Sequence, residues 1–321
     1  MAEPGVLLIT SERTDAHAAP GHPERPERRA AVADGVRRAA AESGAALAEW
    51  EARAATDEEL TRVHPATLVE ALDAWVARGG GWIDADTYLA PGSGEALRLA
   101  AGATIDAALA VADGTAAVAF AVVRPPGHHA SAQQPSGFCL VNNVALAVAA
   151  LRAAERAWRV AIVDWDVHHG DGTQALFEAD ADVCYASTHQ MPLFPGTGAP
   201  DEAGSGMARG TKHNAPLAPG SGDMAFVTAW RDHLLPAIEA FVPEAILVSA
   251  GYDAHAADPL AELEVTEAGY EAVARELGAV AARLGLAGVA LTLEGGYDLD
   301  AIRDSAAATV RGLLAGLSVE R

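Results

Sequence analysis

The amino-acid sequence predicts an α/β fold, in which helices cover both faces of a central parallel sheet in one doubly wound domain. Two observations support this prediction. Helical patterns rich in Ala and Leu alternate along the chain with short apolar runs, which is typical of βα units around a parallel sheet. The chain has 321 residues, 50% of them hydrophobic, and contains no linker long enough to divide it. We therefore expect a single domain over residues 1–321.

Each element follows from a local pattern. Five segments have the composition and spacing of helices: 26–47, 94–113, 142–155, 224–241 and 265–284. Four runs of consecutive apolar residues are typical of strands that are buried on both faces: 117–123, 160–163, 245–250 and 289–293. In an open α/β sheet, ligands bind at the carboxyl ends of the strands, so we expect the segments that follow these four runs to meet in one crevice.

The charge of the chain limits its partners. Asp and Glu number 44 against 22 Lys and Arg, which gives a formal net charge of −22, and Lys212 is the only lysine. A field of this sign repels a nucleic-acid backbone. We therefore expect no direct binding to nucleic acid, and we interpret the acidic surface chiefly as a source of solubility.

Cysteine content and the N-terminal segment indicate the compartment. Cys139 and Cys184 lie in apolar surroundings and provide neither a disulfide framework nor a CxxC zinc motif. The apolar stretch from Val6 to Ile9 is too short for a signal peptide or a membrane span. We expect a soluble cytoplasmic protein without a membrane partner, and no pattern in the sequence indicates its oligomeric state.

A metal site is the first function that the strand ends predict. Asp166 and His168 follow the second apolar run as Asp-x-His, and extended backbone points two such side chains the same way. Asp253 follows the third run. Oxygen and nitrogen ligands suit zinc, and three protein ligands leave further positions for water and substrate. A lone Asp-x-His is more often a turn cap and a core histidine, but the other strand ends here favour one catalytic zinc.

A general base is needed beside such a metal, because two anionic ligands acidify a bound water less than three imidazoles do. His128 and His129 follow the first run through Pro125, Pro126 and Gly127, which predicts a rigid loop that exposes both rings. The carboxylates of Asp164 and Asp171 could each accept an Nδ1–H and fix a tautomer.

Tyr297 is the candidate for electrophilic assistance to the substrate carbonyl. It follows Gly295 and Gly296 after the fourth run, and glycines let a backbone come close to a ligand. Its hydroxyl could donate a hydrogen bond to a substrate carbonyl oxygen as negative charge develops there. Taken alone, this residue is more simply a core tyrosine at a turn.

Together these motifs resemble the zinc-dependent histone deacetylase superfamily, nearest to its class II enzymes and to the bacterial histone-deacetylase-like and acetylpolyamine amidohydrolases. The matching segments cover nearly the whole chain in order: 21–28, 124–130, 137–143, 164–172, 194–198, 251–259 and 294–297. The resemblance implies the arginase/deacetylase fold, with about eight parallel strands. It assigns zinc to Asp166, His168 and Asp253, and acid/base catalysis to His128 and His129 backed by Asp164 and Asp171. Tyr297 is similar to the family's transition-state tyrosine, so the resemblance implies an active enzyme.

The resemblance also implies substrate contacts. Phe138 and Phe194 match the aromatic pair that walls the family's narrow acyl channel, and Asp86 matches a rim aspartate that holds substrate backbone amides. Polyamine-selective relatives of one type place a glutamate directly after the Asp-Pro of the third ligand loop, where this chain has Leu260. That difference favours acyl-lysine or another amide with a neutral stem.

Family members bind potassium near the zinc, mainly through backbone carbonyls, and the resemblance carries these sites to two groups of positions. The first group is Asp164, Asp166, His168, Ser187 and Thr188, and the second is Phe177, Asp180 and Val183. Arg28 matches an arginine of the family's acetate-release channel, although a surface ion pair would explain it equally well.

Three alternatives stay open at this stage. An acetylpolyamine or other small-molecule amidohydrolase would share the chemistry and differ only at the rim, where Asp84 and Asp86 are candidate contacts for a cation. An arginase-like ureohydrolase would need further ligands for two manganese ions, which we do not find. A non-catalytic acyl-binding protein would lack a ligand, a base or the tyrosine, and all of these are present.

Overall fold

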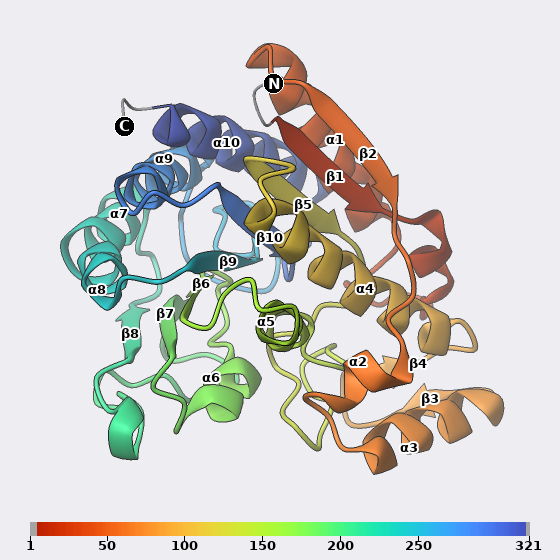
Figure 1. Cartoon of the computed structure of the whole chain (residues 1–321). Coiled ribbons are helices and arrows are strands. Elements are labelled where there is room, and N and C mark those ends of the chain that lie inside the picture. The colour runs from red at the N-terminus through yellow and green to blue at the C-terminus, as the bar shows by residue number, and fades with distance from the viewer. Residues whose placement is uncertain (1–4, 319–321) are drawn as a thin grey trace.

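A parallel sheet of eight strands forms the centre of the molecule in the computed structural model, which describes residues 5–318 (Figure 1). Every neighbouring pair of strands is parallel. In sheet order the strands are β2 (Leu47–Glu51), β1 (Val6–Thr10), β5 (Val118–Val122), β10 (Val289–Leu293), β9 (Ala245–Ala250), β6 (Val160–Asp164), β7 (Val183–Gln190) and β8 (Lys212–Leu217). The predicted α/β fold is therefore confirmed.

Helices cover both faces of this sheet. Those on one face are α1 (Glu27–Glu42), α7 (Asp223–Ala229), the π-helical turn η3 (Trp230–Leu234), α8 (Leu235–Phe241), α9 (Glu267–Arg283) and α10 (Leu299–Leu317). Those on the other face are α4 (Ser93–Ala112) and α5 (Asn143–Ala153). The remaining elements are α2 (Asp57–Thr61), α3 (Ala66–Ala77), α6 (Asp171–Phe177), η1 (Glu12–Ala16), η2 (Gly206–Ala208) and the antiparallel pair β3 (Gly81–Trp82) and β4 (Tyr88–Leu89).

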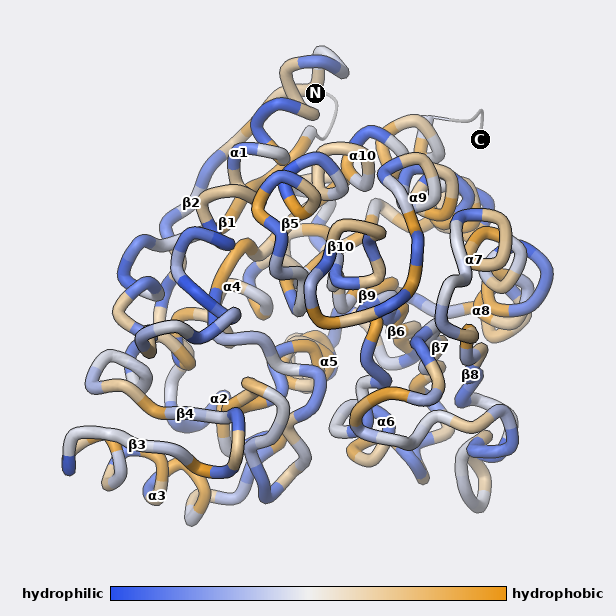
Figure 2. The backbone as a smooth tube through the Cα atoms, turned by 180° about the vertical axis from the view of Figure 1, so that it is seen from behind, coloured by the Kyte–Doolittle hydropathy of each residue, from blue (hydrophilic) through white to orange (hydrophobic). Residues whose placement is uncertain are grey.

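The sheet divides the hydrophobic core into two parts. Strand β5 shows this, because its successive side chains belong to opposite parts. Val118, Phe120 and Val122 pack with α1, α9 and α10, whereas Ala119 and Ala121 pack with α4 and α5. Both sets are fully buried, which is why the strand sequences are apolar throughout rather than alternating. Figure 2 colours the backbone by hydropathy and shows how hydrophobic stretches alternate with hydrophilic ones along the chain. No helix within residues 5–318 combines the length and apolar character that crossing a bilayer requires.

One predicted helix was too long at its end. The pattern over 26–47 is helical only to Glu42, because the chain turns through Ser43 and Gly44, whose φ of 65° is left-handed, and then enters strand β2. The segment 224–241 is divided into α7, η3 and α8. The strands β1, β2, β7 and β8 and the helices α2, α3, α6 and α10 were not among the elements predicted by residue range.

The four predicted strand ends meet in the middle of the sheet. Strands β5, β10, β9 and β6 are consecutive neighbours in the sheet order, and each precedes one of the segments that carry His, Tyr and Asp. Because all four strands run in the same direction, their carboxyl ends lie along one edge. The prediction that these segments converge is therefore confirmed.

Candidate active site

Three side chains from the ends of β6 and β9 form a compact group. One ligand atom each from Asp166, His168 and Asp253 lies within 4.8 Å of the others. The Nδ1 atom of His168 is 3.2 Å from Asp166 Oδ1 and 3.1 Å from Asp253 Oδ2. Asp166 and Asp253 are buried, and His168 is half-buried. The structure thus brings together the three residues predicted as metal ligands.

Backbone hydrogen bonds hold the two carboxylates in place. The amide of Gly295 donates to Asp166 Oδ2 at 2.7 Å, and the amide of Val167 donates to Asp253 Oδ1 at 2.8 Å. The other oxygen of each carboxylate faces His168. Only glycine fits at 295, because a Cβ there would lie 2.2 Å from the Asp253 carboxylate and 2.6 Å from that of Asp166.

The donor set fits a divalent cation. Bonds of about 2.0 to 2.2 Å around a tetrahedral zinc place ligand atoms about 3.3 to 3.6 Å apart, close to the separations from His168 Nδ1. The electrostatics agree: burial favours a neutral ring, but hydrogen bonds to Asp166 and Asp253 raise the pKa of His168 to about 10. One imidazole nitrogen cannot neutralise two buried carboxylates, so the group attracts a cation of higher charge.

Two histidine–aspartate pairs lie beside this group. His128 Nδ1 is 3.1 Å from Asp164 Oδ2, and His129 Nδ1 is 2.7 Å from Asp171 Oδ1. These are the partners predicted to fix the tautomers. The expectation that the loop exposes both rings was wrong, since His128 is 2% and His129 5% exposed. Both rings instead line a cavity.

The two imidazoles have opposite electrostatic surroundings. Burial alone would lower the pKa of His128, but the carboxylates of Asp166 and Asp164 outweigh it and hold that pKa well above its usual value. Burial and the neighbouring His128 lower the pKa of His129 to about 3. These surroundings favour a protonated His128 and a neutral His129.

Tyr297 faces the same cavity from the loop after β10. It is 7% exposed, and burial together with the charge of Asp253 raises its pKa well above the usual value, so its hydroxyl keeps its proton. The guanidinium of Arg28 lies over its ring, 4.9 Å from the centroid. The hydroxyl is thus available as a hydrogen-bond donor.

The cavity that these residues share has a volume of about 290 Å³. All four residues predicted to contact substrate line it: Asp86, Phe138, Phe194 and Leu260. Phe194 is 45% and Leu260 39% exposed, which places them at the mouth, whereas His128 and Asp166 are buried at its base. The lining also includes Leu193, which carried no recognisable signal in the sequence.

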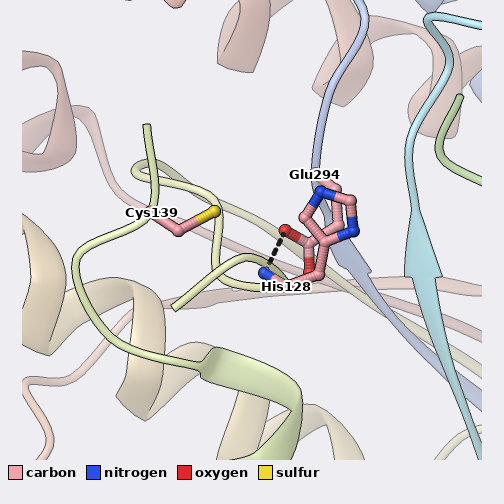
Figure 3. A group of neighbouring side chains, drawn as sticks. All are labelled: His128, Cys139 and Glu294. Carbon is pink, nitrogen blue, oxygen red and sulfur yellow. Dashed lines mark hydrogen bonds between the residues drawn. The ribbon is translucent and has the colours of Figure 1, made fainter. Parts of the chain in front are cut away.

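A second cluster, His128, Cys139 and Glu294, adjoins the first and was not predicted (Figure 3). The carboxylate of Glu294 accepts hydrogen bonds from the amides of Gly127 and His128 and from the hydroxyl of Ser249. Burial raises the pKa of the Cys139 thiol well above its usual value. With its carboxylate already bonded and its thiol neutral, this cluster is better suited to holding the His128 loop than to binding a metal.

Arg28 has no surface role. It is fully buried, bonds to Glu24 at 2.8 Å, and donates to the backbone carbonyls of Glu294 and Gly296. The surface ion pair considered as an alternative is therefore wrong. Arg28 instead supports the backbone that leads to Tyr297, and burial of the ion pair with Glu24 inside the core makes that support rigid.

The positions matched to potassium fall in two places. Asp164 and Ser187 are register partners in β6 and β7, next to Thr188, Asp166 and His168, so the first group is contiguous. The second group is different: the ammonium of Lys212 donates to the carbonyl oxygens of Asp180 and Val183, at 3.2 and 2.7 Å. A potassium ion bound by these carbonyls was the wrong expectation, because the chain's own buried lysine takes that place.

This lysine leads to a prediction about stability. Lys212→Met should lower the free energy of unfolding by about 2 to 4 kcal/mol, because it leaves two buried carbonyls without their donor. Urea unfolding followed by circular dichroism measures the effect. Arg209→Met, which removes an exposed cation from the preceding turn, is the matched control and should change little. Equal stabilities for the two variants would contradict the role given to Lys212.

Comparisons with known proteins place the chain in a family. The model of the histone deacetylase domain family matches residues 22–313. Over 297 residues the chain is 41% identical to histone deacetylase 15 of Arabidopsis thaliana, covering 91% of this chain and 53% of that protein, so it spans about half the length of this relative. It is 42% identical over 313 residues to a probable deacetylase of Methanothermobacter thermautotrophicus, covering 96% and 90%.

Two further comparisons concern a bacterial relative and a solved structure. The chain is 39% identical over 244 residues to the histone deacetylase-like amidohydrolase of Pseudomonas aeruginosa, covering 76% of this chain and 64% of that protein. The crystal structure of the HDA15 HD domain superposes with a TM-score of 0.90 at 39% identity, covering 98% of this chain and 89% of that one. The eight-stranded fold implied by the resemblance is thereby confirmed.

Proposed function

Because this chain belongs to the histone deacetylase domain family, we propose that it is a zinc-dependent amidohydrolase that removes the acetyl group from acyl-lysine or a related acylated amine. One observation supports this function above all. Two of the candidate metal ligands, both histidines of the histidine–aspartate pairs and Tyr297 line a single cavity with an aromatic mouth, and the third ligand and the two aspartate partners lie directly behind them. Metal-assisted hydrolysis of an unactivated amide uses these three kinds of group together.

We assign Asp166, His168 and Asp253 as the ligands of one zinc ion. When bound, zinc would polarise the acyl carbonyl and acidify a water molecule. Two anionic ligands make that acidification weaker than in an all-histidine site, so the protein has to supply a base.

His129 is the proposed base. It is neutral at neutral pH, because burial and the charge of His128 lower its pKa, and Asp171 orients its ring so that Nε2 is free to accept a proton from water. The same nitrogen then returns the proton to the leaving amine. His128, cationic beside Asp164, acts as a fixed positive charge near the reacting carbonyl.

Tyr297 is the proposed oxyanion donor. Its hydroxyl, protonated over the whole working range of pH, would donate a hydrogen bond to the carbonyl oxygen as that oxygen becomes negative. The surrounding low polarity strengthens this bond relative to one in water.

The shape of the cavity favours a slender substrate with a neutral stem. Phe138 packs edge-on to Tyr297 with ring centroids 5.9 Å apart, and Phe194 packs edge-on to His129 at 5.1 Å. Aromatic faces at these positions suit the apolar methylene chain of an acylated lysine. Leu260 adds apolar contact at the mouth and no charge for a distal ammonium.

The substrate class is tested by assaying the purified enzyme against an acetyl-lysine peptide, acetylputrescine and acetylspermidine side by side. We expect the peptide to be hydrolysed at least as efficiently as acetylspermidine. Leu260→Glu should shift the ratio of kcat/KM toward the polyamine by about tenfold, since an opposite charge at a site rim contributes about 1 to 3 kcal/mol.

Glu262→Gln, at an exposed position on the same loop, is the control and should leave the ratio unchanged. A wild-type kcat/KM about a hundredfold higher for an acetylpolyamine than for every acetyl-lysine peptide would overturn the assignment. Asp86 at the mouth, together with its neighbour Asp84, would then be the first cation contact to test.

A further inference from the structure

The sequence of the loop that carries Tyr297 does not by itself restrict the backbone to one conformation. Gly295 and Gly296 precede the tyrosine, and Gly296 has a φ of 111°, a conformation that only glycine adopts without strain. Such a segment has many alternative conformations, so the tyrosine needs an external anchor to hold its hydroxyl in one place.

The anchor on the tyrosine's own amide is a carboxylate from another loop. The amide of Tyr297 donates to Asp258 Oδ2 at 2.8 Å. The other oxygen of the same carboxylate, Oδ1, accepts from the amide of Leu260 at 2.9 Å. Asp258 is 8% exposed and does not line the cavity, so it reaches substrate only through these two residues.

We propose that Asp258 is a positioning residue that fixes the oxyanion donor Tyr297 and the mouth residue Leu260 relative to each other. This inference rests on the role proposed for Tyr297 above. Asp258 joins the loop after β9 to the loop after β10, and both of its bonded partners contact the cavity. A carboxyl group suits this task because it has two oxygens, and each of them accepts one of the two amide hydrogens.

Asp258→Asn separates positioning from general structural support. Asn keeps the volume but turns an NH2 group toward one of the two amide donors, so one of the two bonds is lost. We expect kcat for an acetyl-lysine peptide to fall about tenfold or more, with KM changed by less than about threefold and zinc content unchanged. Glu262→Gln removes a charge from the same loop and serves as the matched control.

A double-mutant cycle decides whether Asp258 acts through the tyrosine. In a Tyr297→Phe background, Asp258→Asn should lower the residual kcat by less than about twofold, because the group being positioned is already gone. A similar loss in both backgrounds, or a loss of zinc on Asp258→Asn, would overturn the proposal. If Asp258→Asn fails to fold, Asp258→Ser, which offers one hydroxyl acceptor, takes its place.

Amide hydrogen exchange gives a readout that does not depend on catalysis. Peptides that contain Tyr297 and Leu260 should exchange faster in Asp258→Asn than in the wild type, and Glu262→Gln should leave them unchanged. Unchanged exchange in Asp258→Asn would refute the anchoring. Absence of any amidase activity in the wild type would refute the proposed function instead, while the exchange result would still report whether Asp258 holds both loops.

Discussion

Chelation of the metal is expected to abolish amide hydrolysis, and zinc or cobalt is expected to restore it. Asp166→Ala should lose the metal itself and lower activity by about a thousandfold or more, because it removes both a ligand and the acceptor for the Gly295 amide. Metal content measured on the purified protein, alongside activity on an acetyl-lysine peptide, checks both statements. We expect about one zinc per chain in the wild type.

The control for this experiment is Asp232→Ala, which truncates an exposed aspartate on η3 that is remote from the cavity lining. Its metal content and activity should equal those of the wild type. Full activity in demonstrably metal-free protein would end the mechanism proposed here. Two tightly bound manganese ions per chain would instead favour an arginase-like reaction.

The grouping of the three candidate metal ligands could be predicted from the sequence, because strand geometry brings these side chains together. Asp166 and His168 project the same way from the end of β6, and Asp253 follows β9, which is the neighbouring strand in the sheet. Parallel strands end along one edge, so residues about ninety positions apart become neighbours without any detailed packing argument. The histidine pairs follow from the same rule applied to β5.

The supporting residues could not be predicted, because their bonds go to the backbone. Asp258 and Glu294 accept hydrogen bonds from amides of other loops, and every non-proline residue has an amide, so no side-chain pattern marks the partner. Lys212 is similar, since its ammonium binds carbonyl oxygens. In the sequence, Glu24 and Arg28 form only a possible i,i+4 ion pair. That the pair is buried depends on tertiary packing, which the local spacing does not reveal.

Strand β2 shows a different limit of the sequence. Its residues, Leu47–Glu51, are all exposed at the edge of the sheet and include two glutamates, whereas the central strands are apolar nearly throughout. The Ala-rich stretch before it continues the helical composition of α1, and only the left-handed Gly44 marks the break. Tertiary pairing with β1 thus outweighs the local preference for helix.

His129→Ala and Tyr297→Phe are each expected to lower kcat by about a hundredfold or more while zinc content stays near normal. The first variant removes the only free imidazole base in the cavity's described lining, since His128 is cationic and His168 faces the two carboxylates. The second removes one hydroxyl that donates only as the oxyanion forms, so KM should change much less than kcat. Steady-state kinetics on an acetyl-lysine peptide measure both effects.

Matched controls exist for each of these two variants. His233→Ala truncates an exposed histidine on η3, and Tyr270→Phe removes a buried hydroxyl that has no hydrogen-bond partner within residues 5–318. Both should keep wild-type turnover. If His129→Ala also turned over at a near wild-type rate with zinc bound, the proton would have to be moved by another group, and if Tyr297→Phe did so, its hydroxyl would not be the oxyanion donor. His128 would be the first candidate, but its raised pKa favours the protonated ring, which has no free nitrogen to accept the proton, and this is why we expect the large losses.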